Sequence, residues 1–431
     1  MRDIVLALFL FAALPIAAFR PFVAIGIFTW LSLMNPHKLT WGFAAFMPWA
    51  QMYAIAAIFS ITFIEPKLVF DSIKRYWLPL LYLAWMLVTT TFATSPDEAW
   101  FRLGEVAKVH LMCLLALAVL SDRNRVKWLL AIIIGSVIFY GVKGGIYTLT
   151  TGGGGRVWGP LKTAINDNNH LAAALVFMFP LLYWAYTEVK QRWQKLALLA
   201  ALALVPISIL GSQSRGAFVA SIAVATMLFL RGKGKLQIAV LTIVLGVGAA
   251  SVMPDEYWSR ISTIKVYQED ASAQGRIHTW KIAARVANDR ITGAGFEYYG
   301  NYLYRRHADD PNDVHSSHSI YFQSLGEHGW IGLTLFLMIL ASFWRKCGRL
   351  IRLGEDRQDD SLSKLARSLQ IALVGYMVGG LFVNVGNWDG LYFVYIVVLG
   401  LSRLNDESEV HTSSPAVPRV QRRRFRKRKH A

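Results

Sequence analysis

The chain has 431 residues, of which 55% are hydrophobic and 13% aromatic, and it carries 45 lysines and arginines against 27 aspartates and glutamates. Apolar runs of about 15 to 25 residues recur along its whole length, which is typical of a helical membrane protein with many spans. This composition excludes a soluble globular enzyme. Membrane topology therefore explains much of the formal net charge of +18. The two cysteines, Cys113 and Cys347, indicate no disulfide framework.

We expect an all-α integral membrane protein with about twelve transmembrane helices. The candidate spans are 4–34, 43–64, 77–94, 106–120, 126–150, 170–187, 195–211, 217–230, 236–253, 319–343, 367–386 and 388–403. The first span is interrupted by Pro15, Arg20 and Pro21, so it is either one bent helix or two short ones. The start of the chain resembles a signal peptide, but no small-residue cleavage site follows it, and we expect no cleavage.

Every second connection between the spans is basic. The basic groups are Lys67, Lys74 and Arg75; Arg123, Arg125 and Lys127; Lys190, Arg192 and Lys195; Arg231, Lys233 and Lys235; and Arg345, Lys346, Arg349 and Arg352. The positive-inside rule places these connections in the cytoplasm. The loops at 95–105, 151–169, 212–216, 254–317 and 387–389 then lie on the other side. With Met1 also in the cytoplasm, parity favours twelve crossings and counts 4–34 once.

The spans and loops divide the chain into four parts. Residues 1–253 form an N-terminal transmembrane bundle, 254–317 a large external loop, 318–403 the C-terminal transmembrane helices, and 404–431 a basic cytoplasmic tail that we expect to be disordered. The run Arg422–Lys429 could bind nucleic acid. It has no folded recognition module, however, and an anchor beside anionic lipids explains it more simply. We expect no nucleic-acid partner.

Two histidines lie at the boundary between the long polar loop, 254–317, and the apolar run 331–343. His315 and His318 precede this run, and Glu327 follows nine residues after His318. Ionisable side chains at such a boundary usually face a cavity, because a charge that faces lipid is costly. Their spacing would allow a metal site, but no His-Glu-x-x-His pattern accompanies them. A histidine base, with an ordinary pKa of about 6.5, is favoured, and a purely structural histidine stays an alternative.

Two arginines on the same external side could bind phosphate. Arg215 lies in the very short link 211–216 between two apolar helices, and Arg276 lies at the start of an amphipathic helix predicted over 272–288. A guanidinium can donate two parallel hydrogen bonds to phosphate oxygens, and a helix N-terminus also favours anions. Contacts with lipid head groups or water remain alternative roles for these arginines.

Three loop segments have less specific signals. The glycines of 152–155, with Arg156, could form an anion nest, although the segment lacks the ending of a phosphate-binding P-loop and a flexible lid is favoured. Residues 293–300 combine glycines and tyrosines, which predicts a tight turn whose rings suit either sugars or an interfacial aromatic belt. Residues 166–170 supply ordinary caps for the helix that follows them.

The pattern His318-Ser319-x-Tyr321, followed by Glu327-x-Gly329-x-x-Gly332, resembles the hallmark of the O-antigen ligase and polymerase superfamily. The Ser214-Arg215-Gly216 turn and Arg276-x-x-x-Trp280 resemble the two other hallmarks of that superfamily, in the same order. The opening of the chain, with Trp30–His37, is similar to a subgroup described as O-glycosylation ligases associated with the exosortase system. One departure is Ser319, where the superfamily often has asparagine.

The resemblance implies a GT-C-like membrane glycosyltransferase that transfers a glycan from a polyprenyl-pyrophosphate donor on the periplasmic face, without a metal or other cofactor. His318 would activate the acceptor hydroxyl, while Arg215 and Arg276 would hold the pyrophosphate. We further assign Tyr321, Trp280 and His315 to substrate binding. Glu327 is expected to support the bundle.

The expected partners are the lipid-linked donor, membrane lipids and an acceptor, which could be lipid A-core, a protein or another glycan. The expected location is the bacterial inner membrane. In-line attack opposite the pyrophosphate predicts inversion of the anomeric centre.

Two other functions stay open. A glycan polymerase would share the same residues and use a second lipid-linked glycan as acceptor. A transporter or flippase for lipid-linked glycans would place ionisable residues at the membrane midplane, where Lys108, His110 and Lys143 are the candidates. The polar residues concentrate at the external surface instead, which favours the enzyme.

Overall fold

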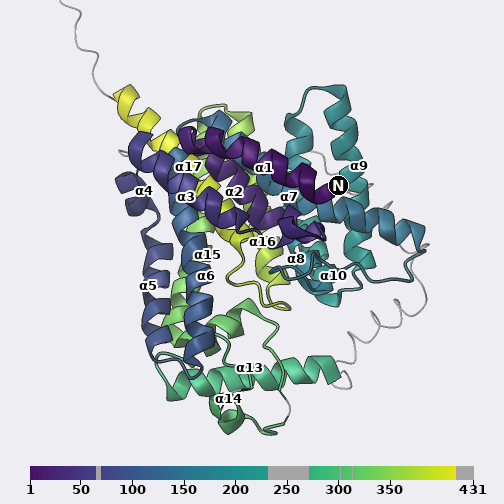
Figure 1. Cartoon of the computed structure of the whole chain (residues 1–431), viewed down its shortest axis with the longest axis vertical. Coiled ribbons are helices and arrows are strands. Elements are labelled where there is room, and N and C mark those ends of the chain that lie inside the picture. The colour runs from purple at the N-terminus through teal and green to yellow at the C-terminus, as the bar shows by residue number, and fades with distance from the viewer. Residues whose placement is uncertain (65–68, 232–270, 301, 313, 414–431) are drawn as a thin grey trace, which may run out of the picture.

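The computed structural model describes residues 1–64, 69–231, 271–300, 302–312 and 314–413. Within these ranges every regular element is a helix and no strand occurs. Most helices pack into one bundle, and α13 (Ala271–Asp289) lies across one end of it (Figure 1). The predicted all-α class is therefore confirmed for the described residues. The predicted span 236–253 and the following residues to 270 lie outside them.

Apolar helices dominate the bundle. Among the described residues, five helices are long and apolar enough to cross a membrane, namely α1 (Arg2–Phe19), α7 (Arg123–Thr150), α8 (Asn168–Glu188), α9 (Arg192–Gly211) and α15 (Ile320–Asp356). Shorter apolar helices are α2 (Pro21–Met34), α3 (Trp49–Ile64) and α5 (Trp77–Thr91). The other helices are α4 (Val69–Arg75), α6 (Pro96–Val119), α10 (Arg215–Arg231), α14 (Tyr302–His307), α16 (Asp360–Gly379) and α17 (Asp389–Ser413). The fold thus supports a multi-pass membrane protein, and the number of twelve crossings stays a prediction.

The first predicted span consists of two helices that pack against each other. The chain leaves α1 at Arg20, whose backbone is extended (φ −130°, ψ 91°), and Pro21 opens α2, where its missing N–H costs no hydrogen bond. The carboxylate of Asp3 accepts a hydrogen bond from the backbone N–H of Gly42 (2.8 Å), so the start of α1 lies beside the segment that follows α2. This hairpin argues against counting 4–34 as one crossing, and the number of crossings and the side of Met1 stay predictions.

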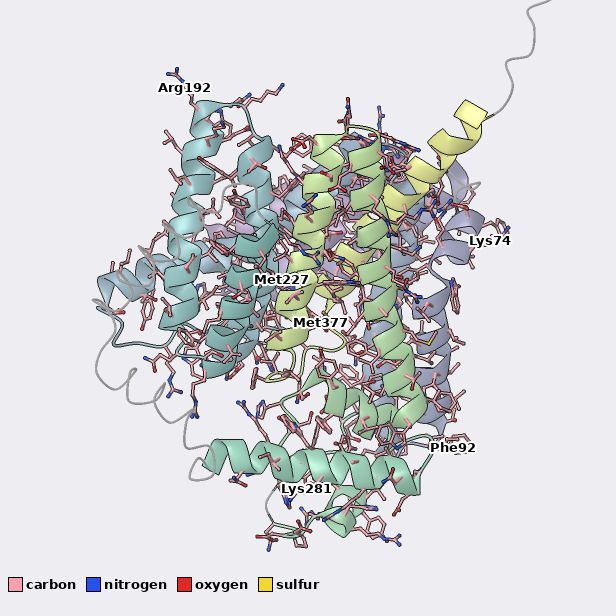
Figure 2. The ribbon with its side chains drawn as sticks, turned by 180° about the vertical axis from the view of Figure 1, so that it is seen from behind. Lys74, Phe92, Arg192, Met227, Lys281 and Met377 are labelled. Carbon is pink, nitrogen blue, oxygen red and sulfur yellow. The ribbon has the colours of Figure 1, made fainter. Side chains whose placement is uncertain are left out.

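The basic connections lie at one end of the bundle, where several of their side chains form ion pairs. The pairs include Arg75–Asp406 (2.8 Å), Lys127–Glu188 (3.2 Å), Arg349–Asp406 (3.1 Å) and Arg123–Asp359. Lys74 and Arg192 lie toward this end in Figure 2, whereas Phe92 and Lys281 lie at the other. The alternation of basic connections along the described chain therefore corresponds to two opposite ends of the molecule.

At the α13 end, α5, α6 and α15 extend beyond the other helices and carry α13 (Figures 1 and 2). The loop after α13 is tied to the α5–α6 hairpin by a hydrogen bond from the N–H of Thr94 to the carbonyl of Ala294 (2.9 Å) and by the Arg102–Glu297 ion pair (2.7 Å). One stripe of α13 is buried, namely Thr279, Ile282, Ala283, Val286 and Ala287. The predicted helix is confirmed, but its buried face is not the apolar stripe that the sequence indicates, Ile277, Trp280, Ala284 and Ala287, because only Ala287 of these four is buried.

A sharp turn at Gly329 divides α15 into a short arm, 320–328, and a long arm, 330–356. Gly329 has φ 67° and ψ −171°, a conformation that side chains rarely tolerate. A Cβ at this position would lie 2.3 Å from the carbonyl oxygen of Ile291. The short arm starts at a hydrogen bond from the N–H of Ile320 to the carbonyl of Gly380 (2.8 Å). The residues before Ile320 are thereby held at the end of α16.

The last described helix, α17, continues past residue 403 to Ser413. The first part of the segment that we expected to be a disordered tail is therefore helical. Residues 414–431, which include the basic run, lie outside the described residues.

Candidate active site

His318 occupies the left-handed region of backbone space, with φ 42°. This conformation costs an L-residue roughly 1–2 kcal/mol, so neighbouring contacts must hold it. The ring is half-buried, and this burial, together with the positive charge of Arg276, lowers the pKa of His318 to about 4. His170 and His315 act in the same direction, and the carboxylate of Asp167 opposes them. The imidazole is therefore neutral near pH 7, which is the form that a base requires.

Both chain neighbours of His318 are bonded to one side chain. The Oδ1 atom of Asn384, between α16 and α17, accepts a hydrogen bond from the backbone N–H of Ser319 (2.8 Å) and another from the hydroxyl of Ser317 (3.0 Å). The sequence analysis missed Asn384, which lies 65 residues after Ser319. No local pattern marks such a distant partner.

Ser317 also connects this loop to α13 and to the segment that follows it. The indole N–H of Trp280 donates to the carbonyl of Ser317 (2.7 Å), and its ring stacks on Phe322 with centroids 4.7 Å apart. Since the Ser317 hydroxyl donates to Asn384, the hydroxyl of Tyr299 donates to Ser317 (2.8 Å). Trp280 thus positions the loop before α15. Its predicted contact with substrate stays a prediction.

Arg276 and Gly216, the residue after Arg215, lie against the same connection between α16 and α17. The guanidinium carbon of Arg276 lies 6.0 Å from the ring centroid of Phe382, within reach of a cation–π contact. Arg215 opens α10, and a Cβ on the next residue, Gly216, would lie 2.5 Å from the Cβ of Phe382. Phe382 thus lies between the helices that carry the two arginines.

One part of the prediction for Arg276 needs correction. The described part of α13 begins at Ala271, so Arg276 lies in the second turn rather than at the start. The free N–H groups of a helix belong to its first turn. They are therefore not available at Arg276, and its attraction for anions must come from the guanidinium.

Tyr321 and His315 have separate surroundings. The hydroxyl of Tyr321 donates to the carbonyl of Met377 (2.9 Å), which joins α15 to α16. The backbone N–H of His315 donates to the hydroxyl of Tyr304 (3.2 Å). His315 also lines a pocket of about 590 Å³ beside α13, together with Gln274, Gly275, Ile277, His278, Lys281, Asp309 and Asp310. Substrate binding by Tyr321 and His315 stays a prediction.

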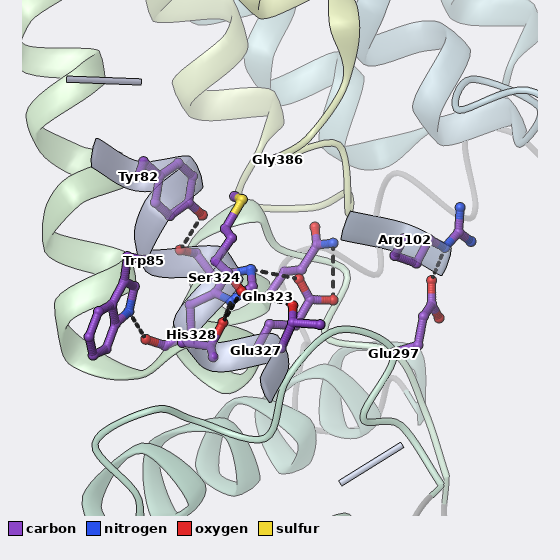
Figure 3. Close-up of polar contacts among 12 residues, drawn as sticks. Tyr82, Trp85, Arg102, Glu297, Gln323, Ser324, Glu327, His328 and Gly386 are labelled. Carbon is purple, nitrogen blue, oxygen red and sulfur yellow. Dashed lines mark hydrogen bonds and ion pairs between the residues drawn. The ribbon is translucent and has the colours of Figure 1, made fainter. Parts of the chain in front are cut away.

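Glu327 lies in the short arm of α15 with only 2% of its surface exposed. Its carboxylate accepts a hydrogen bond from the amide of Gln323 (3.4 Å; Figure 3). The next residue, His328, is fully buried, and its Nδ1 lies 2.8 Å from the hydroxyl of Thr89. The indole N–H of Trp85 donates to the carbonyl of His328 (2.8 Å; Figure 3). These contacts join α5 to α15, and the sequence analysis had not singled out His328.

The residues considered for a transport path do not line up in the interior. Lys108 pairs with Glu105 at the surface (2.8 Å), and Lys143 is exposed. His110 is buried, and its Nδ1 lies 3.0 Å from the hydroxyl of Tyr76. Two of the three predicted candidates are therefore on the outside of the bundle.

The fold and this site define a multi-pass membrane protein with a half-buried neutral histidine near the guanidinium of Arg276 at one end. Residues 199–337, which include Arg215, Arg276 and His318, match the model of the O-antigen ligase family, Wzy_C. Residues 1–190 match the model of a family of unknown function, DUF5935. No curated protein matches the chain.

The match over 199–337 supports the O-antigen ligase superfamily and, with it, an enzyme of the ligase or glycosyltransferase type. The predicted resemblance is thus supported at the level of the superfamily. The likeness to the exosortase-associated subgroup stays a prediction.

Proposed function

We propose that the protein transfers a glycan from a polyprenyl-pyrophosphate donor to an acceptor hydroxyl, at the α13 end of the bundle. We assign this end to the periplasmic face of the bacterial inner membrane, because the basic connections lie at the opposite end. The observation that carries the proposal is the neutral imidazole of His318 beside the guanidinium of Arg276.

In the proposed reaction His318 is the base. Its neutral imidazole accepts the proton of the acceptor hydroxyl as that oxygen forms a bond to the anomeric carbon. The bond from this carbon to the pyrophosphate oxygen breaks, and the diphosphate leaves with the electron pair. In-line attack inverts the anomeric centre.

Arg215 and Arg276 have the complementary role of binding the pyrophosphate. The leaving diphosphate gains negative charge in the transition state, and fixed cations stabilise such charge more than they stabilise the ground state. Guanidinium groups suit phosphate oxygens because they can donate two parallel hydrogen bonds. The activated bond arrives with the lipid, so the proposed reaction requires no nucleotide.

Replacement of the base tests this proposal. His318→Ala should lower glycan transfer by about 10²–10⁴-fold, the usual contribution of a general base. The assay uses membranes that contain the full chain and a lipid-linked glycan extracted from the same host, with products analysed by mass spectrometry. Product length in this assay also separates single transfer from polymerisation.

The matched control is His307→Ala in α14, which should retain transfer. Arg276→Lys should lose less activity than Arg276→Ala, because lysine keeps the charge but not the paired hydrogen bonds. Full activity of His318→Ala at normal expression would contradict the proposal.

A further inference from the structure

We propose that Asn384 is a positioning residue for His318. Its amide oxygen binds the residues on both sides of the histidine and so fixes the imidazole at the reacting groups. This inference rests on the proposed function, in which His318 is the base. It adds a residue outside the motifs that suggested that function.

The half-buried Asn384 binds two residues that are themselves buried. Ser317 and Ser319 are both fully buried, and the two bonds to Oδ1 measure 3.0 Å and 2.8 Å. An amide oxygen has two lone pairs, so both bonds can form together. A buried N–H group without a partner costs about 1–3 kcal/mol. The asparagine therefore stabilises this particular path of the backbone.

The same bonds explain how His318 remains at a positive φ. A residue in the left-handed region persists only where its surroundings determine its conformation from more than one direction. Asn384 binds before and after the histidine, while Trp280 adds a hydrogen bond to the carbonyl of Ser317. Without the asparagine oxygen, the turn can relax and shift the imidazole. A misplacement of about 1 Å can cost on the order of 10²-fold in rate.

The connection 380–386 also sets the position of the base relative to the cations. Gly380 accepts the hydrogen bond that starts the short arm of α15. Phe382 lies against Arg276 and against Gly216, the neighbour of Arg215. Asn384 follows two residues later and binds the loop of His318. The connection 380–386 therefore contacts the loop of His318 and the helices that carry Arg215 and Arg276.

Two variants of Asn384 test whether this residue positions His318 or only stabilises the fold. Asn384→Ala removes the oxygen and should lower kcat by about 10- to 100-fold. The KM for the lipid-linked donor should change by less than about twofold, because Arg215 and Arg276 belong to other helices. Asn384→Asp keeps an acceptor oxygen and should restore most of kcat. Asn312→Ala, in the exposed loop before His315, is the matched control and should behave like the unmodified protein.

The aspartate variant has a second signature. Its carboxylate favours the charged imidazole, so the pKa of His318 should rise and the acid limb of the pH profile should move to higher pH. The charged and titratable groups already near His318 are Arg276, His170, Asp167 and His315, and they are the same in both variants. A residue that only stabilised the fold would not shift this limb.

A measurement without substrate gives an independent readout. Diethyl pyrocarbonate modifies neutral imidazoles, and mass spectrometry of the purified full chain reports the modification rate at each histidine. In Asn384→Ala, His318 should react several-fold faster, whereas His307 should not change. Faster reaction of both histidines would indicate general unfolding and would overturn a specific positioning role.

The outcomes distinguish this inference from the proposed function. If the unmodified protein and His318→Ala transfer glycan equally, the proposed function fails. If His318→Ala is inactive while Asn384→Ala keeps its kcat, the proposed function stands and this inference fails. Should Asn384→Ala not fold, an inactive Asn384→Asp with normal folding would equally overturn the inference.

Discussion

At His318, burial and the positive charge of Arg276 keep the imidazole neutral, and the proposed donor would offset the second of these. Burial and the charge of Arg276 together lower the pKa of the free histidine to about 4. A pyrophosphate bound at Arg276 brings negative charge, which offsets the guanidinium and raises the pKa of His318. The histidine would therefore become a stronger base once the donor is bound. Its pKa would then lie closer to the operating pH, where a general base is most effective.

This coupling predicts two different acid limbs. The neutral imidazole is the active form, so the rate falls as pH falls through its pKa. The limb of kcat/KM reports the free protein and should lie near pH 4, while the limb of kcat reports the donor complex and should lie at higher pH. Initial rates from about pH 3 to 8 cover both limbs. Coincident limbs at about pH 6.5, the ordinary value for histidine, would refute the coupling.

Arg276→Gln provides the matching test at the same scale. Removal of the guanidinium should move the limb of kcat/KM to higher pH, since a like charge that disfavours the imidazolium is gone. Arg306→Gln, an exposed arginine in α14, should leave that limb in place.

Among the elements, α15 depends most clearly on one backbone conformation. Gly329→Ala should destabilise the protein by about 1–3 kcal/mol through the positive φ alone, and the contact with the carbonyl of Ile291 adds to this cost. Transfer activity should fall as well, because the short arm leads directly from His318. Thermal unfolding in detergent measures the first effect.

The control for Gly329 lies in the same helix. A Cβ on Gly348 would meet only the amide nitrogen of Gln370, at 3.8 Å, and alanine is preferred to glycine within a helix by about 0.5–1 kcal/mol. Gly348→Ala should therefore unfold at the same temperature or a higher one. Equal unfolding temperatures for the two variants would show that the turn at Gly329 is not strained by a side chain.

Local sequence signals predicted most of the helices, but not the contacts between residues that are far apart in the chain. Apolar periodicity is a local property, so it predicted most of the helices, α13 among them, but not which face of α13 is buried. Pro21 marked the break between α1 and α2, but no local signal showed that the start of α1 lies beside Gly42. Arg276 and His318 were recognised from short motifs. Asn384 was missed because its role comes from contact with Ser317 and Ser319, and Gly329 appeared only as a motif position without its conformation.

For the whole molecule, the two ends can be assigned by cysteine labelling. Cys113 and Cys347 are both buried, so the unmodified protein provides a low background. In intact cells a membrane-impermeant maleimide should label Asp310→Cys, at the α13 end. It should label Lys74→Cys, among the basic connections, only after permeabilisation. The reverse pattern would overturn the assignment of the α13 end to the periplasm.

The same experiment tests the hairpin of α1 and α2. Trp41 is 89% exposed and lies next to Gly42, which contacts Asp3. The helix α3 leads from this region to α4 at the basic end. Trp41→Cys should therefore be labelled in intact cells together with Asp310→Cys. Labelling only after permeabilisation would support the cytoplasmic position predicted for Met1.

The connection between α16 and α17 has a consequence for exchanging parts between related proteins. Phe382 and Asn384 lie outside the residues that either family model matches, 1–190 and 199–337. A chimera that imports only 199–337 from a relative would receive the histidine and both arginines, but it would keep the host's own 380–386. We expect such chimeras to be inactive unless the two segments are transplanted together, so the smallest interchangeable unit for acceptor or donor choice is discontinuous in sequence.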